Sequence, residues 1–265
     1  MDKPKVSIIM AVYNGEEFLQ DSILSVLNQT YKNFEFVIVN DGSTDNTAKI
    51  LEEFSKNDSR IKIVNNIENI GLTKSLNRGI RESVGEYIAR LDAGDLSTPD
   101  RIEREVDFLN KNKDIGLVGS WMQIIDTEGK TVEEVKYPTE DEIIRHDLIG
   151  YNPFVHSSIM FRRGVGQKAG FYNEVYKYAQ DYNFYFQLLP HTKFSNIPAC
   201  LVKYRRYPNS ITMTKNREQI KFANRARALA IESGLYSKLN YMFVVRSFLI
   251  SLLPSKIKFF VKKHI

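Results

Sequence analysis

The first hundred residues alternate short apolar runs with amphipathic stretches, and this alternation limits the possible folds more than any other feature of the chain. Four runs are short and largely apolar: VSIIMAV, FEFVIVN, IKIVNN and GEYIARLD. Such runs are typical of parallel strands that are covered on both faces. Three stretches between them have helical spacing of their apolar residues: EEFLQDSILSVLNQ, DGSTDNTAKILEEFSKN and LTKSLNRGIRES. The order predicts an α/β fold with a right-handed, doubly wound parallel sheet.

The second half of the chain has a different pattern. A helix predicted over 99–112 precedes a long strand, and short strands and helices then alternate less regularly. A long polar helix is expected over 215–233. Because the sequence shows no internal repeat and no low-complexity linker, we expect one fused domain over 1–212 and a helical C-terminal extension over 213–265.

The composition excludes several classes of protein. The 37 basic residues exceed the 32 acidic ones only mildly, giving a net charge of +5, so we expect no nucleic-acid partner. Cys200 is the single cysteine, and no Cys/His spacing predicts a zinc site, which favours a reducing compartment. The apolar run over 6–13 lacks a small-residue cleavage site, so we interpret it as a strand and not as a signal peptide.

Polar residues follow the predicted strands, at the edge of the sheet where α/β folds bind ligands. They are Tyr13, Asn14, Asn40, Asp41, Asn66, Asn69, Asp92 and Asp95. Asp41 can accept a hydrogen bond from a base N–H or a ribose hydroxyl, and Gly42 permits a close turn. The alternative is an Asp-Gly turn that caps the next helix. The set predicts a site for a ligand with many hydrogen-bonding groups.

Three acidic residues have patterns with chemical meaning. Asp92 and Asp95 cluster in one turn after a buried strand, and burying like charges together is unfavourable unless a cation or hydroxyl groups compensate. A divalent ion on a diphosphate would compensate. The alternative is that Asp95 caps the next helix. Asp181 precedes an apolar helix, where it is either a helix cap or a general base.

Three other side chains are candidates for lining a pocket: His156, Trp121 and Tyr151. A lone histidine beside a strand and aromatic residues near a core are more often structural, so both interpretations stay open. The chain has no GxGxxG after the first strand, no GxxxxGK[ST] and no GxSxG. These absences argue against a dinucleotide dehydrogenase, a P-loop enzyme and an α/β-hydrolase.

Six segments, taken in order, resemble a known family. They are VSIIMAVYNGEEFL, SVLNQTYKNFEFVIVNDGSTDNT, ENIGLTKSLNRGI, GEYIARLDAGDLSTPDRIE, NPFVHSSIMFRR and YAQDYNFYFQL. Over about residues 4–212 the chain resembles the inverting family-two glycosyltransferases of the GT-A fold. The resemblance implies a Rossmann-like, mostly parallel central sheet flanked by helices. It also implies transfer of a sugar from a nucleotide-sugar, expected to be a UDP-sugar, to an acceptor hydroxyl.

The resemblance also implies roles for single residues on the donor side. Tyr13, Asn14 and Asp41 would hold the nucleotide base and ribose. Lys74, in the predicted third helix, is a candidate for binding the diphosphate. These positions fall in a nucleotide-sugar-binding half over about 1–98.

On the acceptor side, Asp181 matches the family's catalytic base. Trp121 and His156 are the candidates for the acceptor pocket, in an acceptor half over 99–212. The acceptor implied by the resemblance is a glycan, free or lipid-linked.

A metal ion is the expected cofactor, either Mn²⁺ or Mg²⁺, with Asp92 and Asp95 as its ligands. Asp92 begins the family's D-x-D motif. The family usually has DADD, however, and here the third position is Gly94. Tyr207 also stands where the family often has a metal-binding histidine, and Gln180 where a glutamate usually precedes the base. Three alternatives stay open: Asp95 replaces the lost ligand, the diphosphate holds most of the ion, or metal dependence is weak.

Two alternatives stay open at this point. A sugar-1-phosphate nucleotidyltransferase shares the general fold but normally carries a Gly- and Arg-rich loop after the first strand, which VYNGEEF is not. A catalytically dead sugar-nucleotide-binding protein would agree with the two lost ligands. The intact acidic residues argue against it.

The C-terminal segment is apolar and basic. Its apolar run over 241–253 is shorter than the about 20 residues that span a membrane, and four lysines follow Pro254: Lys256, Lys258, Lys262 and Lys263. A helix of this kind can lie on an anionic membrane surface. We therefore predict a cytoplasmic enzyme that residues 241–265 hold peripherally at the inner membrane face. The alternative is a helix packed on the catalytic domain or on the second subunit of a homodimer.

Overall fold

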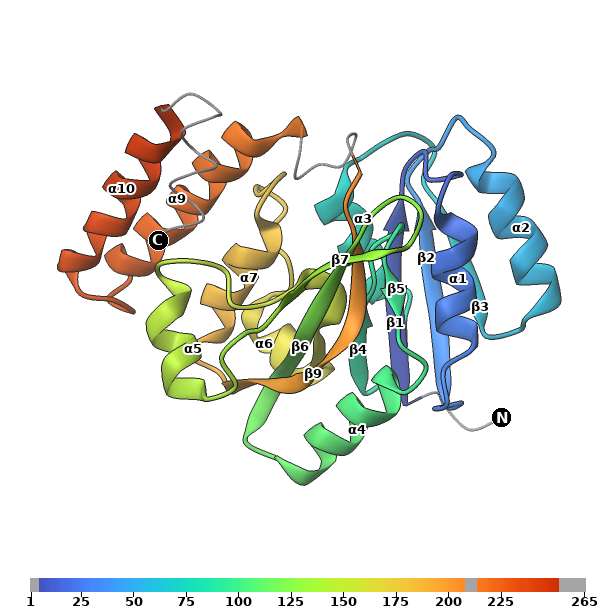
Figure 1. Ribbon diagram of the computed structural model, residues 1–265, viewed down its shortest axis with the longest axis horizontal. Helices are drawn as coiled ribbons and strands as arrows, with labels where there is room; N and C mark the ends of the chain where they lie inside the picture. Colours follow the sequence, from blue (N-terminus) through green and yellow to red (C-terminus); the bar gives the residue numbers. More distant parts are fainter. Residues whose placement is uncertain (1–4, 208–213, 253–265) are drawn as a thin grey trace.

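The computed structural model describes residues 5–207 and 214–252, and its first half contains the elements that the sequence predicts. In chain order they are β1 (Val6–Val12), α1 (Leu19–Leu27), β2 (Phe34–Asn40), α2 (Thr47–Asn57), β3 (Ile61–Asn65), α3 (Leu72–Arg81) and β4 (Tyr87–Arg90). Strands and helices alternate strictly, so the predicted α/β architecture is confirmed (Figure 1).

The second half adds shorter elements of both kinds. They are β5 (Leu96–Ser97), α4 (Arg101–Lys111), β6 (Ile115–Ile125), β7 (Thr131–Val135), α5 (Asp141–Leu148), η1 (His156–Ser158), β8 (Met160–Arg162), α6 (Arg163–Ala169), α7 (Gln180–Leu188) and β9 (Lys193–Arg205). Three helical elements follow: α9 (Asn216–Glu232), η2 (Lys238–Asn240) and α10 (Tyr241–Leu252).

One sheet runs through both halves of the chain. Its order is β3-β2-β1-β4-β8-β6-β9-β5, with β7 beside β6. The first four strands are parallel, as predicted. Strand β8 is antiparallel to both of its neighbours, whereas β6 and β9 are parallel to each other. The sheet is therefore parallel from β3 to β4 and mixed beyond β4.

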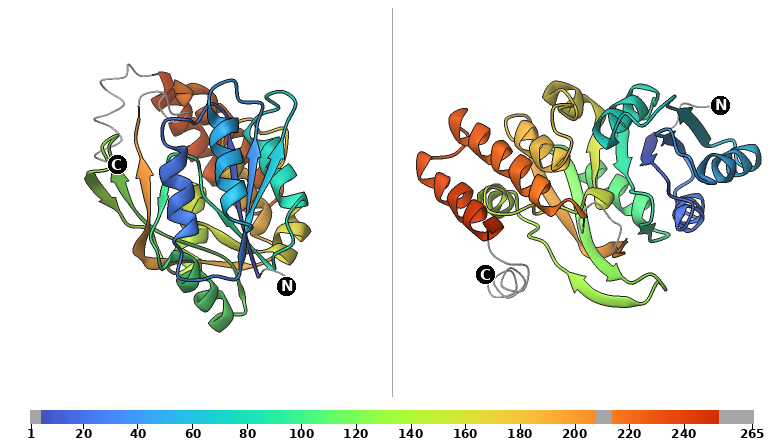
Figure 2. Two further views of the ribbon diagram at one scale, coloured as in Figure 1. Left: turned by 90° about the vertical axis from the view of Figure 1, so that its right-hand side faces the viewer. Right: turned by 90° about the horizontal axis from the view of Figure 1, so that it is seen from above.

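Helices cover both faces of this sheet and enclose a core on each (Figures 1 and 2). Successive side chains of a strand point to opposite faces. On β1, Ile8 and Met10 belong to the core with α1, α2 and α4, while Ile9 and Ala11 belong to the core with α3, α5 and α7. This double burial is why the strand sequences are continuously apolar instead of alternating.

The C-terminal helices dock on the second half of the domain. Helix α9 packs on α7, and α10 lies along α9 at the outer end of the molecule (Figure 1). The buried Arg227 of α9 donates hydrogen bonds to the carbonyl oxygens of Ile149, at 2.9 Å, and Gly150, at 3.0 Å, just after α5. Within 5–207 and 214–252, no helix is long and apolar enough to cross a membrane.

Candidate functional site

The turn after β1 is fastened to the turn after β2. Asn14 has a φ of 49°, its N–H donates to Ser43 Oγ at 3.0 Å, and its Oδ1 accepts from the Thr44 N–H at 2.8 Å. Tyr13 beside it is 48% exposed. Both predicted donor-binding residues therefore lie at the carboxyl end of the parallel strands, where the sheet offers its ligand edge.

Asp41 is buried at this edge and holds the loop between β3 and α3. Its Oδ1 accepts from Asn66 Nδ2 at 2.6 Å and from the Ile70 N–H at 3.0 Å, and its Oδ2 accepts from the Gly71 N–H at 3.0 Å. The capping alternative for Asp41 is wrong, because the first N–H of α2 is bonded to the Asp45 carboxylate instead. Asp41 is 3% exposed and already accepts three hydrogen bonds, so its contact with the nucleotide stays a prediction.

The loop that Asp41 holds leads directly into α3. Lys74 lies in the first turn of that helix and is exposed. Gly42 has a φ of +71°, and a Cβ there would come within 2.5 Å of the Glu68 backbone, so the two loops approach too closely for any side chain.

The acidic turn after β4 is bridged by one serine. Ser157 Oγ lies 3.2 Å from Asp92 Oδ2, donates to Asp95 Oδ2, and accepts from the Asp92 N–H at 3.1 Å. Asp95 also accepts from the Arg205 N–H at 3.0 Å. Burial, together with the charge of Asp92, raises the pKa of Asp95 to about 7. The alternative that Asp95 caps the next helix is wrong, because α4 begins at Arg101 and Asp95 accepts a hydrogen bond from Ser157.

Arg90 is the site residue that sequence reasoning missed. It is fully buried at the end of β4 and donates to Asp92 Oδ1 and to the Ile9 carbonyl. Burial alone would raise the pKa of Asp92, but the charges of Arg90 and His156 and the hydrogen bonds from Ser157 and Arg90 together outweigh it and hold that pKa below its usual value. A signal was present, since an arginine in a buried strand needs a partner and the nearest acid is two residues away.

His156 joins the acidic turn to the predicted base. Its Nδ1 lies 3.7 Å from Asp92 Oδ2, and its Nε2 lies 2.8 Å from the Tyr172 hydroxyl. Burial, and then the charge of Arg90, lower the pKa of His156, whereas the charges of Asp92 and Asp181 act in the opposite direction. His156 is thus near enough to both Asp92 and Asp181 to respond to their charges.

Asp181 lies in the first turn of α7 and is partly exposed. Its Oδ2 accepts from Asn152 Nδ2 at 2.9 Å, and no side chain caps the helix. The structure thus positions the carboxylate through Asn152 and does not use it as the predicted alternative, a helix cap. Asn152 was also missed, although it begins the segment NPFVHSSIMFRR that resembles the family.

The aromatic candidates lie further along the second half. Trp121 on β6 is partly buried; its Nε1 donates to the Tyr137 carbonyl at 2.9 Å, and the Lys136 ammonium lies 5.2 Å from its ring centre. Tyr151 is 45% exposed, and its hydroxyl donates to Asp147 Oδ2 at 3.0 Å. None of these contacts reaches the acidic cluster, so the acceptor role of Trp121 remains a prediction.

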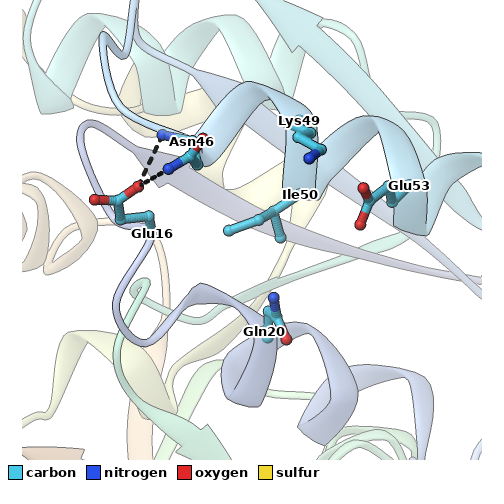
Figure 3. A pocket seen from close by; sticks show the side chains of 6 residues that line it. All are labelled: Glu16, Gln20, Asn46, Lys49, Ile50 and Glu53. Carbon is cyan, nitrogen blue, oxygen red and sulfur yellow. Dashed lines mark hydrogen bonds between the residues drawn. The ribbon is translucent and has the colours of Figure 1, made fainter.

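A polar hollow between α1 and α2 contains no predicted site residue. It has a volume of about 450 Å³ and is lined by Glu16, Gln20, Asn46, Lys49, Ile50 and Glu53. Figure 3 shows Glu16 directed at Asn46, with which it forms hydrogen bonds of 2.7 and 2.9 Å. These bonds brace the turn after β1 against the start of α2, which is a structural use.

The described residues offer no metal site built from protein side chains alone. They include no group of three or more His, Cys, Asp or Glu side chains arranged to hold one. Gly94 and Tyr207, where the resemblance leads one to expect ligands, are neighbours, since a Cβ on Gly94 would lie 3.6 Å from Tyr207 Cε1. Asp95 is 4% exposed and engaged by protein donors, so it is poorly placed to replace either ligand.

Solved structures share this fold. S. aureus TarS 1–349 in complex with UDP-GlcNAc has a TM-score of 0.68 and 17% identity, covering 96% of this chain and 82% of that one. A mannosyltransferase from Pyrobaculum calidifontis, in complex with GDP-Man and Mn²⁺, has a TM-score of 0.68 and 17% identity, covering 94% and 70%. The likeness shows the fold, which is that of the GT-A glycosyltransferases.

The sequence comparisons place the chain within this class. The model of Glycosyl transferase family 2 matches residues 7–170. An uncharacterized glycosyltransferase of Haemophilus influenzae is 38% identical over 233 residues, covering 84% of this chain and 72% of the relative. The O-antigen biosynthesis glycosyltransferase WbnJ of Escherichia coli is 32% identical over 215 residues, covering 77% and 81%. The chain belongs to glycosyltransferase family 2, as its sequence motifs predict.

Proposed function

We propose that this glycosyltransferase transfers a hexosyl group from a UDP-sugar to an acceptor hydroxyl, with inversion at the anomeric carbon. The observation that carries the proposal is that His156 lies 3.7 Å from Asp92 and responds to the charges of both Asp92 and Asp181. One carboxylate lies at the ligand edge of the parallel strands, and the other is partly exposed and held by Asn152. This arrangement suits a donor site and a base that adjoin each other.

The chemistry is a direct displacement. Asp181 takes the proton of the acceptor hydroxyl while its oxygen bonds to the anomeric carbon. The bond from that carbon to the diphosphate oxygen breaks on the opposite face, and the diphosphate leaves with the electron pair. A carboxylate is a weak base at neutral pH, but it suffices when the hydroxyl is acidified by bond formation in the transition state.

Donor binding and acceptor binding would fall in the two halves of the chain. Residues 1–98 would bind the nucleotide-sugar and 99–212 the acceptor, with 213–265 as an extension. The donor class draws support from TarS, which is solved with UDP-GlcNAc. WbnJ is named for O-antigen biosynthesis, which supports a glycan or lipid-linked acceptor in the synthesis of a bacterial surface polysaccharide.

The catalytically dead binder is the alternative that an observation favours, because Gly94 and Tyr207 are not metal ligands. Release of UDP from a UDP-sugar separates the two functions. A binder would gain thermal stability with the nucleotide but would release no UDP above the uncatalysed rate. We expect release, because the three acidic residues Asp41, Asp92 and Asp181 are all present.

Alanine at Asp41 or at Asp92 is expected to weaken UDP binding by about tenfold or more, the effect of losing a hydrogen bond to a charged group. Isothermal titration calorimetry measures it. Asp114→Ala is the matched control, because that carboxylate is exposed and paired with Lys193 in an ion pair at 2.9 Å. Thermal unfolding checks that Asp41→Ala stays folded. Normal UDP affinity in both site variants would remove them from the donor site.

The proposed place of action is the inner membrane face, reached through the C-terminal extension. One side of α10 is exposed and apolar, with Met242 64%, Val245 55%, Phe248 56% and Leu249 56% exposed. The other side, with Phe243 and Val244, packs on the domain. The predicted lysines follow at 256, 258, 262 and 263, outside the described residues. An apolar helix face followed by lysines suits an anionic lipid surface.

Flotation with vesicles tests this extension. The full chain is expected to float with vesicles that contain phosphatidylglycerol, less with phosphatidylcholine alone, and a chain ending at Gly234 should not float. A chain ending at Leu252 isolates the lysines, and Val245→Glu with Phe248→Glu isolates the apolar face at exposed positions. Equal flotation of all versions, or no flotation of the full chain, would show that residues 241–265 do not bind the membrane. A dimer that the double variant abolishes would assign α10 to a second subunit.

A further inference from the structure

Two residues far apart in the sequence meet beside the acidic turn. Gly94 has a φ of +105°, and among the described residues a Cβ placed on it would approach only Tyr207, at 3.6 Å. The Tyr207 ring packs against Phe18 with 5.5 Å between ring centres. Burial raises the pKa of the Tyr207 hydroxyl, and the nearby charges of Asp95 and Asp92 raise it further. The hydroxyl is therefore a protonated donor next to the acidic turn.

Both carboxylates of that turn already have protein partners. Asp95 accepts from Ser157 and from the Arg205 N–H. Asp92 accepts from Arg90, and its side chain is 35% exposed. Among the described residues, Asp92 is thus the one partly exposed carboxylate of the turn itself, and a single carboxylate holds a divalent ion only together with substrate phosphates and water.

We propose that the donor binds without a protein-held divalent ion, and that the Tyr207 hydroxyl donates a hydrogen bond to the diphosphate in its place. Among the described residues, only Tyr207 would contact an atom at the Cβ position of Gly94, so a phosphate oxygen fits there beside the phenol. A hydroxyl that donates to a charged phosphate oxygen forms one of the stronger kinds of hydrogen bond. This inference rests on the proposed function and specifies how the donor's diphosphate is recognised.

Two measurements test it on the full chain. Electron paramagnetic resonance of free Mn²⁺ should show no loss of signal when nucleotide-free protein is added. Calorimetry should give the same UDP affinity in EDTA and in Mn²⁺. Tyr207→Phe removes only the hydroxyl and should weaken UDP binding by about tenfold in both buffers.

Variants that restore metal ligands give the converse test. Tyr207→His, alone and with Gly94→Asp, places an imidazole and a carboxylate at neighbouring positions. We expect these variants to bind Mn²⁺ and to lose UDP affinity in EDTA. Since an aspartate is strained at the φ of Gly94, the single variant guards against misfolding.

Three results would overturn the inference: Mn²⁺ bound by the nucleotide-free natural chain, UDP affinity that drops in EDTA, or a Tyr207→Phe variant that binds UDP normally. If UDP binds in neither buffer, the UDP-specific part of the proposed function fails, and the same pair of titrations with GDP decides the inference. Binding of neither nucleotide overturns both.

Discussion

Asp181→Asn is expected to lower the transfer rate by about 10²–10⁴-fold, the range that general acid–base catalysis contributes. The asparagine keeps the shape of the side chain and can still accept from Asn152 through its amide oxygen. It no longer takes a proton from the acceptor hydroxyl. We therefore expect kcat to fall while UDP affinity stays the same, because UDP binding does not involve the transfer of a proton to Asp181.

The measurement is UDP release from whichever UDP-sugar most raises the thermal stability of the protein, with and without added glycan. Asp147→Asn is a matched control, since that carboxylate accepts from Tyr151, just before Asn152, but not from Asn152 itself. Asn152→Ala should lower kcat less than Asp181→Asn does and leave UDP affinity intact, as expected of a positioning residue. Near-normal turnover by a folded Asp181→Asn protein would exclude Asp181 as the base.

The first half of the fold could be predicted because its physics is local. Each parallel strand is buried on both faces, which leaves a continuous apolar run in the sequence, and each helix leaves its own spacing. The sequence of the second half lacks such clear patterns. Strand β5 consists of Leu96–Ser97 alone and exists because it pairs with β9, more than a hundred residues away. Such pairing is decided by the tertiary structure.

The same distinction holds for the site. Its acidic residues could be predicted, because carboxylates that directly follow buried strands fall at the ligand edge. Their partners could not. Ser157 bridges Asp92 and Asp95 from a short helical turn with no distinctive pattern. Gly94 and Tyr207 are the two positions at which the sequence differs from the family's metal-binding pattern. They lie side by side only because β9 ends beside the acidic turn, which the sequence does not show.

Arg101→Met is expected to destabilise the folded protein by about 3–5 kcal/mol, because it breaks a buried ion pair and leaves the other charge unpaired. The side chains of Arg101 and Glu105 on α4 are 1% and 0% exposed, and Arg101 Nε lies 2.8 Å from Glu105 Oε1. Glu105 Oε2 has no hydrogen-bond partner in the described structure. Adding Glu105→Met should recover most of the loss, since apolar groups of similar volume often replace such a pair at little cost.

The pH dependence separates this mechanism from simple loss of packing. Burial raises the pKa of Glu105 to about 7, although the Arg101 charge lowers it. A carboxyl whose folded pKa is above its unfolded value near 4.5 stabilises the fold while protonated. That contribution is complete below about pH 4.5 and is lost as the pH rises through about 7. Urea unfolding at pH 5 and pH 8 should therefore show a larger deficit for Arg101→Met at pH 8, and no such difference in the double variant. Equal deficits at both pH values would mean that the unpaired Glu105 charge is not what destabilises the fold.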